Sequence, residues 1–131
     1  MRANRRRDTG PERRLRSELH RLGLRFRVDH PVRVAGHRPL RPDVVFPQKR
    51  VVVYVDGCWW HGCPTHWTKS RTNGEYWSSK ITANRDRDAR HRLLLEREGW
   101  VVVRFWEHED MSTAARAVEA IVRRRESDRQ D

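Results

Sequence analysis

The stretch RPDVVFPQKRVVVYVDG, residues 41–57, decides the fold. Residues 42–46, which are apolar except for Asp43, and the apolar run 51–55 flank the polar turn PQKR and therefore predict two strands joined as a hairpin. The second run is apolar at every position, and a strand that is apolar on both faces belongs inside a covered sheet. We therefore expect residues 51–55 to form the central strand.

Before this hairpin the pattern is helical and then extended. DTGPERRLRSELHRLG, residues 8–23, predicts a helix that begins with a capping box between Thr9 and Glu12 and ends at Gly23. Its buried stripe is formed by Leu15, Leu19 and Leu22. LRFRV, residues 24–28, alternates apolar and basic residues as a half-buried strand does, and residues 29–40 predict a loop.

After the hairpin, residues 75–99 predict a long helix closed by Gly99 and WVVVRFWE, residues 100–107, another buried strand. Residues 112–125 predict a final helix capped by Ser112. This order indicates an α/β fold with a mixed central sheet flanked by helices. The 131 residues suit a single domain, 1–131, with a basic N-terminal arm over about residues 1–8 and a charged C-terminal helix and tail over about 111–131.

The charge balance indicates a polyanionic partner. The chain has 29 Lys and Arg against 18 Asp and Glu, a formal charge of +11, and all but three of the cations are Arg. Because the Arg fork pairs with phosphate and stacks on bases, double-stranded DNA is the expected partner, against the alternative of a merely soluble basic surface. No apolar run approaches the roughly 20 residues of a membrane span. We expect a cytoplasmic, nucleoid-associated monomer with no membrane partner.

The segment VDGCWWHGCPTHW, residues 55–67, concentrates soft metal ligands. In a reducing compartment Cys58 and Cys63 suit metal binding better than a disulfide. His61, His66 and His108 are candidates to complete a tetrahedral zinc site. The alternative is a pair of buried free thiols.

Adjacent indoles and two acids add further signals. Trp59 and Trp60 point to different sides of the backbone, so at least one is expected to be exposed as a platform for bases, unless it covers the sheet edge. Asp43 begins the first hairpin strand and Asp56 ends the second, so both acids would meet at one sheet end and suit Mg²⁺. The alternative reading of "PD" is an ordinary turn.

Four motifs together resemble the very-short-patch-repair (Vsr) mismatch endonucleases over about residues 8–109: DTGPERRLRSELHRLGLRFRV, RPDVVFPQKRVVVYVDGCWWHGC, EYWSSKITANRDRD and GWVVVRFWEHE. The resemblance implies a PD-(D/E)XK, restriction-endonuclease-like core with a structural zinc site. It also implies an enzyme that nicks DNA beside a T:G mismatch left by deamination of 5-methylcytosine. A functional link to a cytosine methyltransferase and to repair proteins would follow.

By this resemblance, Asp43 and the backbone carbonyl of Val55 would bind the catalytic Mg²⁺. His61 would activate water, and Glu12 and Asp88 would hold waters around the magnesium ion or orient that histidine. The aromatic residues that wedge into the duplex would be Trp59, Trp60 and Trp77.

The chain also departs from the family pattern. No lysine stands two residues after Asp56, so another group must act as base, and His61 suits that role because its ordinary pKa is near neutrality. His108 stands where the family has its last Cys ligand, and Asp56 where the best-known members carry a histidine, which leaves its role as a second metal ligand open. We assign zinc to Cys58, Cys63, His66 and His108, with His61 as the alternative ligand.

Three functional hypotheses follow. The first is a Mg²⁺-dependent nicking enzyme of the mismatch-repair type. The second is a related nuclease of a restriction or defence system without mismatch specificity. The third is a zinc-stabilised DNA-binding module without catalysis.

Overall fold

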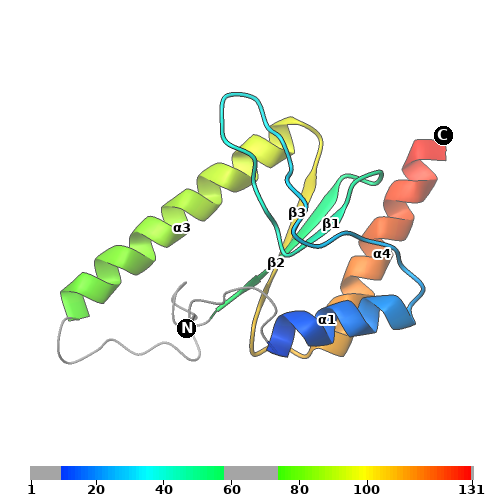
Figure 1. The fold of residues 1–131 in the computed structure, drawn as a ribbon, viewed down its shortest axis with the longest axis horizontal. Coiled ribbons are helices and arrows are strands. Elements are labelled where there is room, and N and C mark those ends of the chain that lie inside the picture. The colour runs from blue at the N-terminus through cyan, green and yellow to red at the C-terminus, as the bar shows by residue number, and fades with distance from the viewer. Residues whose placement is uncertain (1–9, 58–73, 131) are drawn as a thin grey trace.

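The computed structural model describes residues 10–57 and 74–130, with side chains described for 10–57 and 79–125. In these ranges three helices surround three strands (Figure 1). In chain order the elements are α1 (Gly10–Arg21), β1 (Val44–Phe46), β2 (Val51–Asp56), α3 (Gly74–Arg97), β3 (Val101–Trp106) and α4 (Met111–Gln130). None of the described helices is both long enough and apolar enough to cross a membrane.

The sheet of the described residues is mixed, as expected. Strand β2 lies between β1, with which it pairs antiparallel, and β3, with which it pairs in parallel. The β1–β2 register places Val44 opposite Val53, and the β2–β3 register runs from Val51 opposite Val101 to Asp56 opposite Trp106. The prediction that residues 51–55 form the central strand is confirmed.

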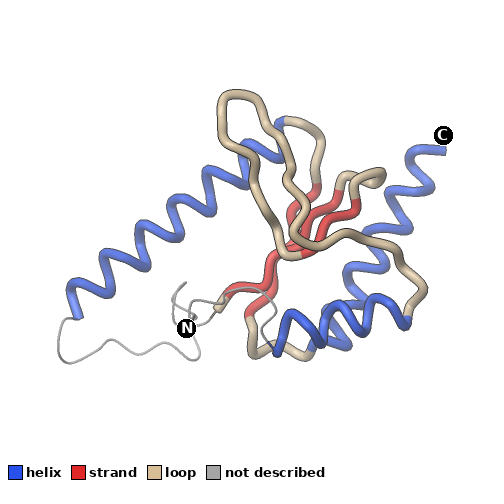
Figure 2. The backbone as a smooth tube through the Cα atoms, in the orientation of Figure 1, coloured by secondary structure: helices blue, strands red, loops and turns tan. Residues whose placement is uncertain are grey.

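Helices cover both faces of this sheet, as Figure 2 shows. Because side chains alternate along a strand, the all-apolar β2 supplies two separate cores. One core joins α1 and α4 to the sheet through Leu15, Leu19, Val44, Phe46, Val51, Val53, Ala115 and Val118. The other joins the end of α3 and the loop before β1 through Val32, Val34, Leu40, Val45, Val52, Leu95 and Val102.

The prediction of a strand at residues 24–28 is wrong. The segment forms only one bridge, in which the N–H of Arg27 donates to the Val45 carbonyl at 2.8 Å and the Arg27 carbonyl accepts from the Val45 N–H at 2.9 Å. Asp29 then adopts a positive φ of 52°, which turns the chain away from β1. The alternation gave the correct burial at the start of the segment, where Leu24 is buried and Arg25 exposed, but not at its end, where Val28 is 45% exposed.

The predicted helix ends need one correction. Gly23 and Gly99 follow α1 and α3 with φ of 80° and 87°, as a C-terminal glycine should. The cap of α4 is Asp110 rather than Ser112, because its Oδ2 accepts from the N–H of Thr113 at 3.0 Å and from the Thr113 hydroxyl at 2.7 Å. These bonds lower the pKa of Asp110. Thr9, the expected partner in the capping box of α1, lies outside the described residues.

Candidate active site

The carboxyl groups of buried Glu12 and half-buried Asp43 lie where α1 meets the start of β1, and we call them the buried carboxyl pair. Glu12 is three residues before Leu15 on the same side of α1, and this packed side directs it inward until only 5% of it is exposed. Asp43 accepts a hydrogen bond from the N–H of Val55 at 2.7 Å and shares a second one with the Glu12 carboxyl group. The β1–β2 hairpin and α1 therefore bring one carboxyl group each to the same point.

This environment raises the pKa of Asp43 from 3.8 to about 7. Burial is the largest cause, and the neighbouring charge of Glu12 is the next; the Val55 N–H opposes them. Near neutral pH a proton therefore offsets part of the repulsion within the buried carboxyl pair. A divalent cation offsets the same repulsion with a larger charge, so the donor set suits Mg²⁺.

The backbone of Val55 adds an oxygen on the same side. The Asp56 carbonyl accepts from the Glu107 N–H at 2.9 Å, on the β3 side of β2. Neighbouring residues of a strand direct their backbone groups to opposite sides, so the N–H and carbonyl of Val55 face the β1 side, where Asp43 lies. One or two carboxylates with additional oxygens is the usual protein contribution to Mg²⁺.

A second cluster, the carboxylate–arginine network of Asp56, Asp88 and Arg104, lies at the same sheet end. Nη1 of Arg104 donates to Asp56 Oδ1 at 2.9 Å, and its Nη2 is 3.7 Å from Asp88 Oδ1. The structure thus brings Asp43 and Asp56 to one sheet end, as the hairpin predicted. The carboxylate of Asp56 is directed to Arg104. This ion pair explains why an acid stands at position 56 without assigning it a role as a metal ligand.

Tyr54 and Arg104 were not singled out from the sequence. The guanidinium carbon of Arg104 lies 4.2 Å from the ring centroid of Tyr54. Burial is the main cause that raises the pKa of Tyr54 to about 12, and the charges of Asp43, Asp88 and Asp56 act in the same direction. The sequence did contain a signal for Arg104, because it is the single charged residue within the apolar run WVVVRFW. A charge placed in a buried strand requires a partner.

Several predicted site residues lie outside the described residues: Cys58, Trp59, Trp60, His61, Cys63 and His66. Trp77 is described only as part of the backbone of α3. His108 is exposed in the turn after β3, and its neighbour Glu107 bonds to Asp56 near the point where β2 leads to Cys58. Within residues 10–57 and 74–130, no three His, Cys, Asp or Glu side chains form a group that could hold a metal ion.

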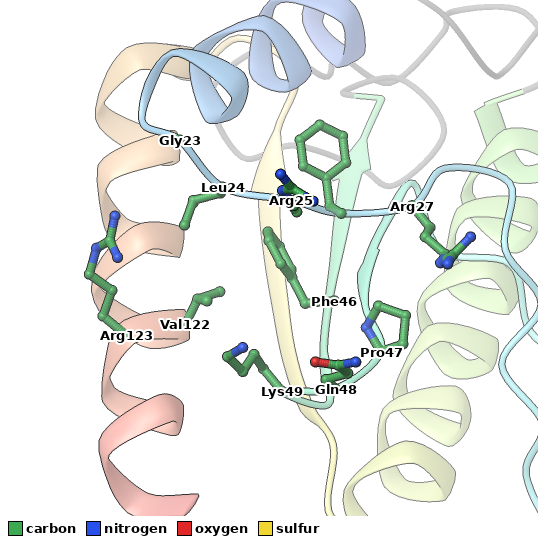
Figure 3. A pocket seen from close by; sticks show the side chains of 11 residues that line it. Gly23, Leu24, Arg25, Arg27, Phe46, Pro47, Gln48, Lys49, Val122 and Arg123 are labelled. Carbon is green, nitrogen blue, oxygen red and sulfur yellow. The ribbon is translucent and has the colours of Figure 1, made fainter. Parts of the chain in front are cut away.

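A groove of about 730 Å³ opens at the opposite end of the hairpin. Figure 3 shows Phe46 at its centre, with Leu24 and Val122 toward α4 and Lys49 in the turn after β1. Its basic lining residues are Arg25, Arg27, Lys49 and Arg123, and its lining includes no acid. This groove is separate from the buried carboxyl pair, and the candidate active site remains the other sheet end.

Comparison with known proteins decides the family. The sequence profile of the DNA mismatch endonuclease Vsr matches residues 1–69. The chain is 45% identical over 118 residues to the type II nicking enzyme V.NaeI of Lentzea aerocolonigenes, covering 90% of this chain and 71% of the relative. This chain belongs to the Vsr family. It is therefore a DNA endonuclease, as expected.

Other Vsr-like relatives agree. The type II nicking enzyme V.XorIIP of Xanthomonas oryzae pv. oryzae is 44% identical over 115 residues, covering 83% of this chain and 77% of the relative. The DNA mismatch endonuclease Vsr of Escherichia coli is 40% identical over 108 residues, covering 82% of this chain and 66% of the relative. Vsr membership implies the nuclease fold, of which the described mixed sheet and its helices are part.

Proposed function

We propose that this chain is a Mg²⁺-dependent endonuclease that nicks one DNA strand beside a T:G mismatch. The observation that carries the proposal is the buried carboxyl pair beside the Val55 backbone, a set of oxygens with excess negative charge. When bound there, Mg²⁺ would polarise the scissile phosphate and lower the pKa of the attacking water. Asp43, Glu12 and the Val55 carbonyl would hold it.

His61 is the proposed general base. It follows Val55 by six residues, in the segment that continues from the sheet end that holds the carboxyl pair. An imidazole with a pKa near neutrality can take a proton from water at physiological pH. This role would replace the lysine that standard PD-(D/E)XK sites use. Asp88 in the carboxylate–arginine network would orient His61 or the waters.

A structural zinc bound by Cys58, Cys63, His66 and His108 is the second part of the proposal. The position of His108 beside the end of β2 supports it, because Cys58 follows Asp56 by two residues. Protein purified without added zinc should contain about one equivalent, and Cys58→Ser should lose both zinc and stability, since metal binding and folding are coupled. Metal analysis with thermal melting measures both.

His61→Ala provides the control for this zinc assignment. It should keep its zinc and its melting temperature while nicking falls by about 10²-fold or more. Loss of zinc from His61→Ala with retention in His66→Ala would reverse the two roles. Zinc-free, fully stable wild-type protein would contradict the site altogether.

Mismatch selectivity is proposed to come from Trp59, Trp60 and Trp77. A T:G pair is stacked less well than a Watson–Crick pair, so opening its step costs less, and an inserted indole recovers part of the cost. Trp60→Ala should therefore lower nicking of a T:G duplex by about tenfold or more, since a base–aromatic stack contributes about 1–3 kcal/mol. Binding to matched DNA, which arginine–phosphate contacts supply, should change little.

The assay compares T:G and matched duplexes with and without Mg²⁺, beside thermal melting of each protein. If Trp60→Ala loses stability and both activities together, Trp60 is a core residue and not a wedge. The names of V.NaeI and V.XorIIP, type II nicking enzymes, favour a second candidate function, a nuclease of a restriction system. Equal nicking of both duplexes by the wild-type protein would select that candidate, and DNA binding without nicking would select a non-catalytic module.

A further inference from the structure

Arg104 connects three elements at the candidate active site. In the β2–β3 register it stands opposite Tyr54, on the sheet face toward α3, and it extends one guanidinium arm to Asp56 of β2 and the other toward Asp88 of α3. The side chains of Arg104, Asp56 and Asp88 are 18%, 13% and 18% exposed. Because water reaches them poorly, these charges interact more strongly than surface ion pairs do.

We propose that Arg104 is a positioning residue of the nuclease site, which fixes Asp56 and Asp88 beside the buried carboxyl pair without itself contacting DNA. The proposal rests on the proposed endonuclease function and assigns a role within it. Both arms of the guanidinium group are directed to carboxylates, and its central carbon lies over the Tyr54 ring, 4.2 Å from the ring centroid. This arrangement holds the guanidinium group in one orientation.

The carboxyl groups of Glu12, Asp43, Asp56 and Asp88 lie in this region. Arg104 bridges Asp56 and Asp88, and Arg87 also lies 3.9 Å from Asp88. The negative charge of Asp56 raises the pKa of Asp43, and the charges of Asp43, Asp56 and Asp88 all raise the pKa of Tyr54. The acids of both clusters therefore lie in one region. Without a cation, Asp56 and Asp88 would repel each other and would also repel an approaching phosphate. Arg104 offsets this charge and fixes α3 to the end of β2. A fixed positive charge thus stands in a nuclease site that has no lysine after its second acid.

The test begins with Arg104→Gln, which keeps hydrogen-bonding groups and removes the charge. Nicking kcat should fall by about 10²-fold, because displacements of about 1 Å in a site have effects of this size. KM for DNA should change less than about threefold, since an interaction lost away from the substrate affects mainly kcat. DNA affinity in EDTA, measured without catalysis, should equal that of the wild type.

A double-mutant cycle separates charge compensation from other roles. Asp56→Asn combined with Arg104→Gln removes both charges of the pair, so the double variant should melt in EDTA above Arg104→Gln alone and should recover part of its kcat. Arg92→Gln is the matched control. Arg92 pairs with Glu96 at 3.0 Å on the exposed surface of α3, and its loss should leave kcat and the melting temperature nearly unchanged.

Three results would overturn the proposal. The first is a tenfold or greater loss of DNA affinity in EDTA on Arg104→Gln, which would indicate direct phosphate contact. The second is unchanged kcat. The third is a melting temperature of the double variant no higher than that of Arg104→Gln.

If Arg104→Gln does not fold, Arg104→Lys replaces it, with reduced kcat and unchanged DNA affinity expected. A wild-type protein that does not nick would refute the proposed function, whereas the melting cycle in EDTA would still test the network.

Discussion

Asp43→Asn should lower Mg²⁺-dependent nicking by about 10³-fold or more while DNA affinity in EDTA stays within about twofold. The substitution removes one of the two charges of the buried carboxyl pair and leaves the shape of the side chain almost unchanged. Binding is retained because the arginine-rich surface supplies it independently of this site. Plasmid nicking and DNA binding by fluorescence anisotropy measure the two effects.

The same variant should be more stable than the wild type in EDTA at pH 8. Below pH 3.8 Asp43 is protonated in the folded and unfolded states alike. As pH rises from 3.8 toward about 7, the unfolded chain loses this proton first, so the native state binds more protons and its stability falls. Each unit by which the native pKa exceeds the unfolded pKa corresponds to about 1.4 kcal/mol in the free energy of unfolding. Asn carries no such charge and should remove this part of the pH dependence.

Asp29→Asn is the matched control for Asp43→Asn. Asp29 is an exposed carboxylate paired with Arg41 at 2.9 Å, away from the buried carboxyl pair, and its loss should leave nicking and the pH profile of melting as they are. Retained nicking in Asp43→Asn would contradict the metal-binding role. Equal pH profiles of wild type and Asp43→Asn would contradict the raised pKa.

Leu15→Ala should lower the free energy of unfolding by about 3 kcal/mol, a large part of the stability of a domain this size. Leu15 is 0% exposed in the core that joins α1 and α4 to the sheet, so truncation leaves a cavity. Mg²⁺ should restore part of the loss, because α1 carries Glu12 and ligand binding favours the native state. Urea unfolding with and without Mg²⁺ provides the measurement.

Leu93→Ala on α3 makes the same chemical change where the side chain is 59% exposed. It should alter the free energy of unfolding by no more than about 0.5 kcal/mol. Equal effects of the two substitutions would show that Leu15 does not anchor α1, and the placement of Glu12 would then need another explanation.

The sequence was sufficient to predict the fold where a local pattern of residues determines the structure. The all-apolar run at residues 51–55 identifies the central strand, and the hairpin pattern alone predicts that Asp43 and Asp56 lie at one sheet end. The alternation in residues 24–28 gave the burial of Leu24 but neither the exposure of Val28 nor the pairing, because a strand also needs a partner edge over several residues. Asp110 replaced Ser112 as the cap of α4 because the helix begins one residue earlier than its apolar pattern indicated.

Contacts between residues far apart in the chain could not be predicted from the sequence. Glu12 was considered as a capping residue and, through the family resemblance, as a site residue, yet its bond to Asp43 depends on how α1 packs against the sheet. Arg104 likewise gains its role only when β3 lies beside β2 and α3 packs over that face. Such contacts arise from tertiary packing and leave only a weak trace in the sequence, here one charge in an apolar run.

The parallel pairing of β2 with β3 separates two kinds of evolutionary change. Parallel neighbours require a long connection, and here it consists of residues 57–100, which include the zinc and wedge candidates as well as α3. The β1–β2 and β2–β3 registers are made by pairs within the strands, so the alignment of Asp43, Val55 and Asp56 does not depend on which aromatic residues follow β2. The proposed wedge residues could therefore diversify among descendants of such an enzyme while the carboxyl pair is inherited unchanged.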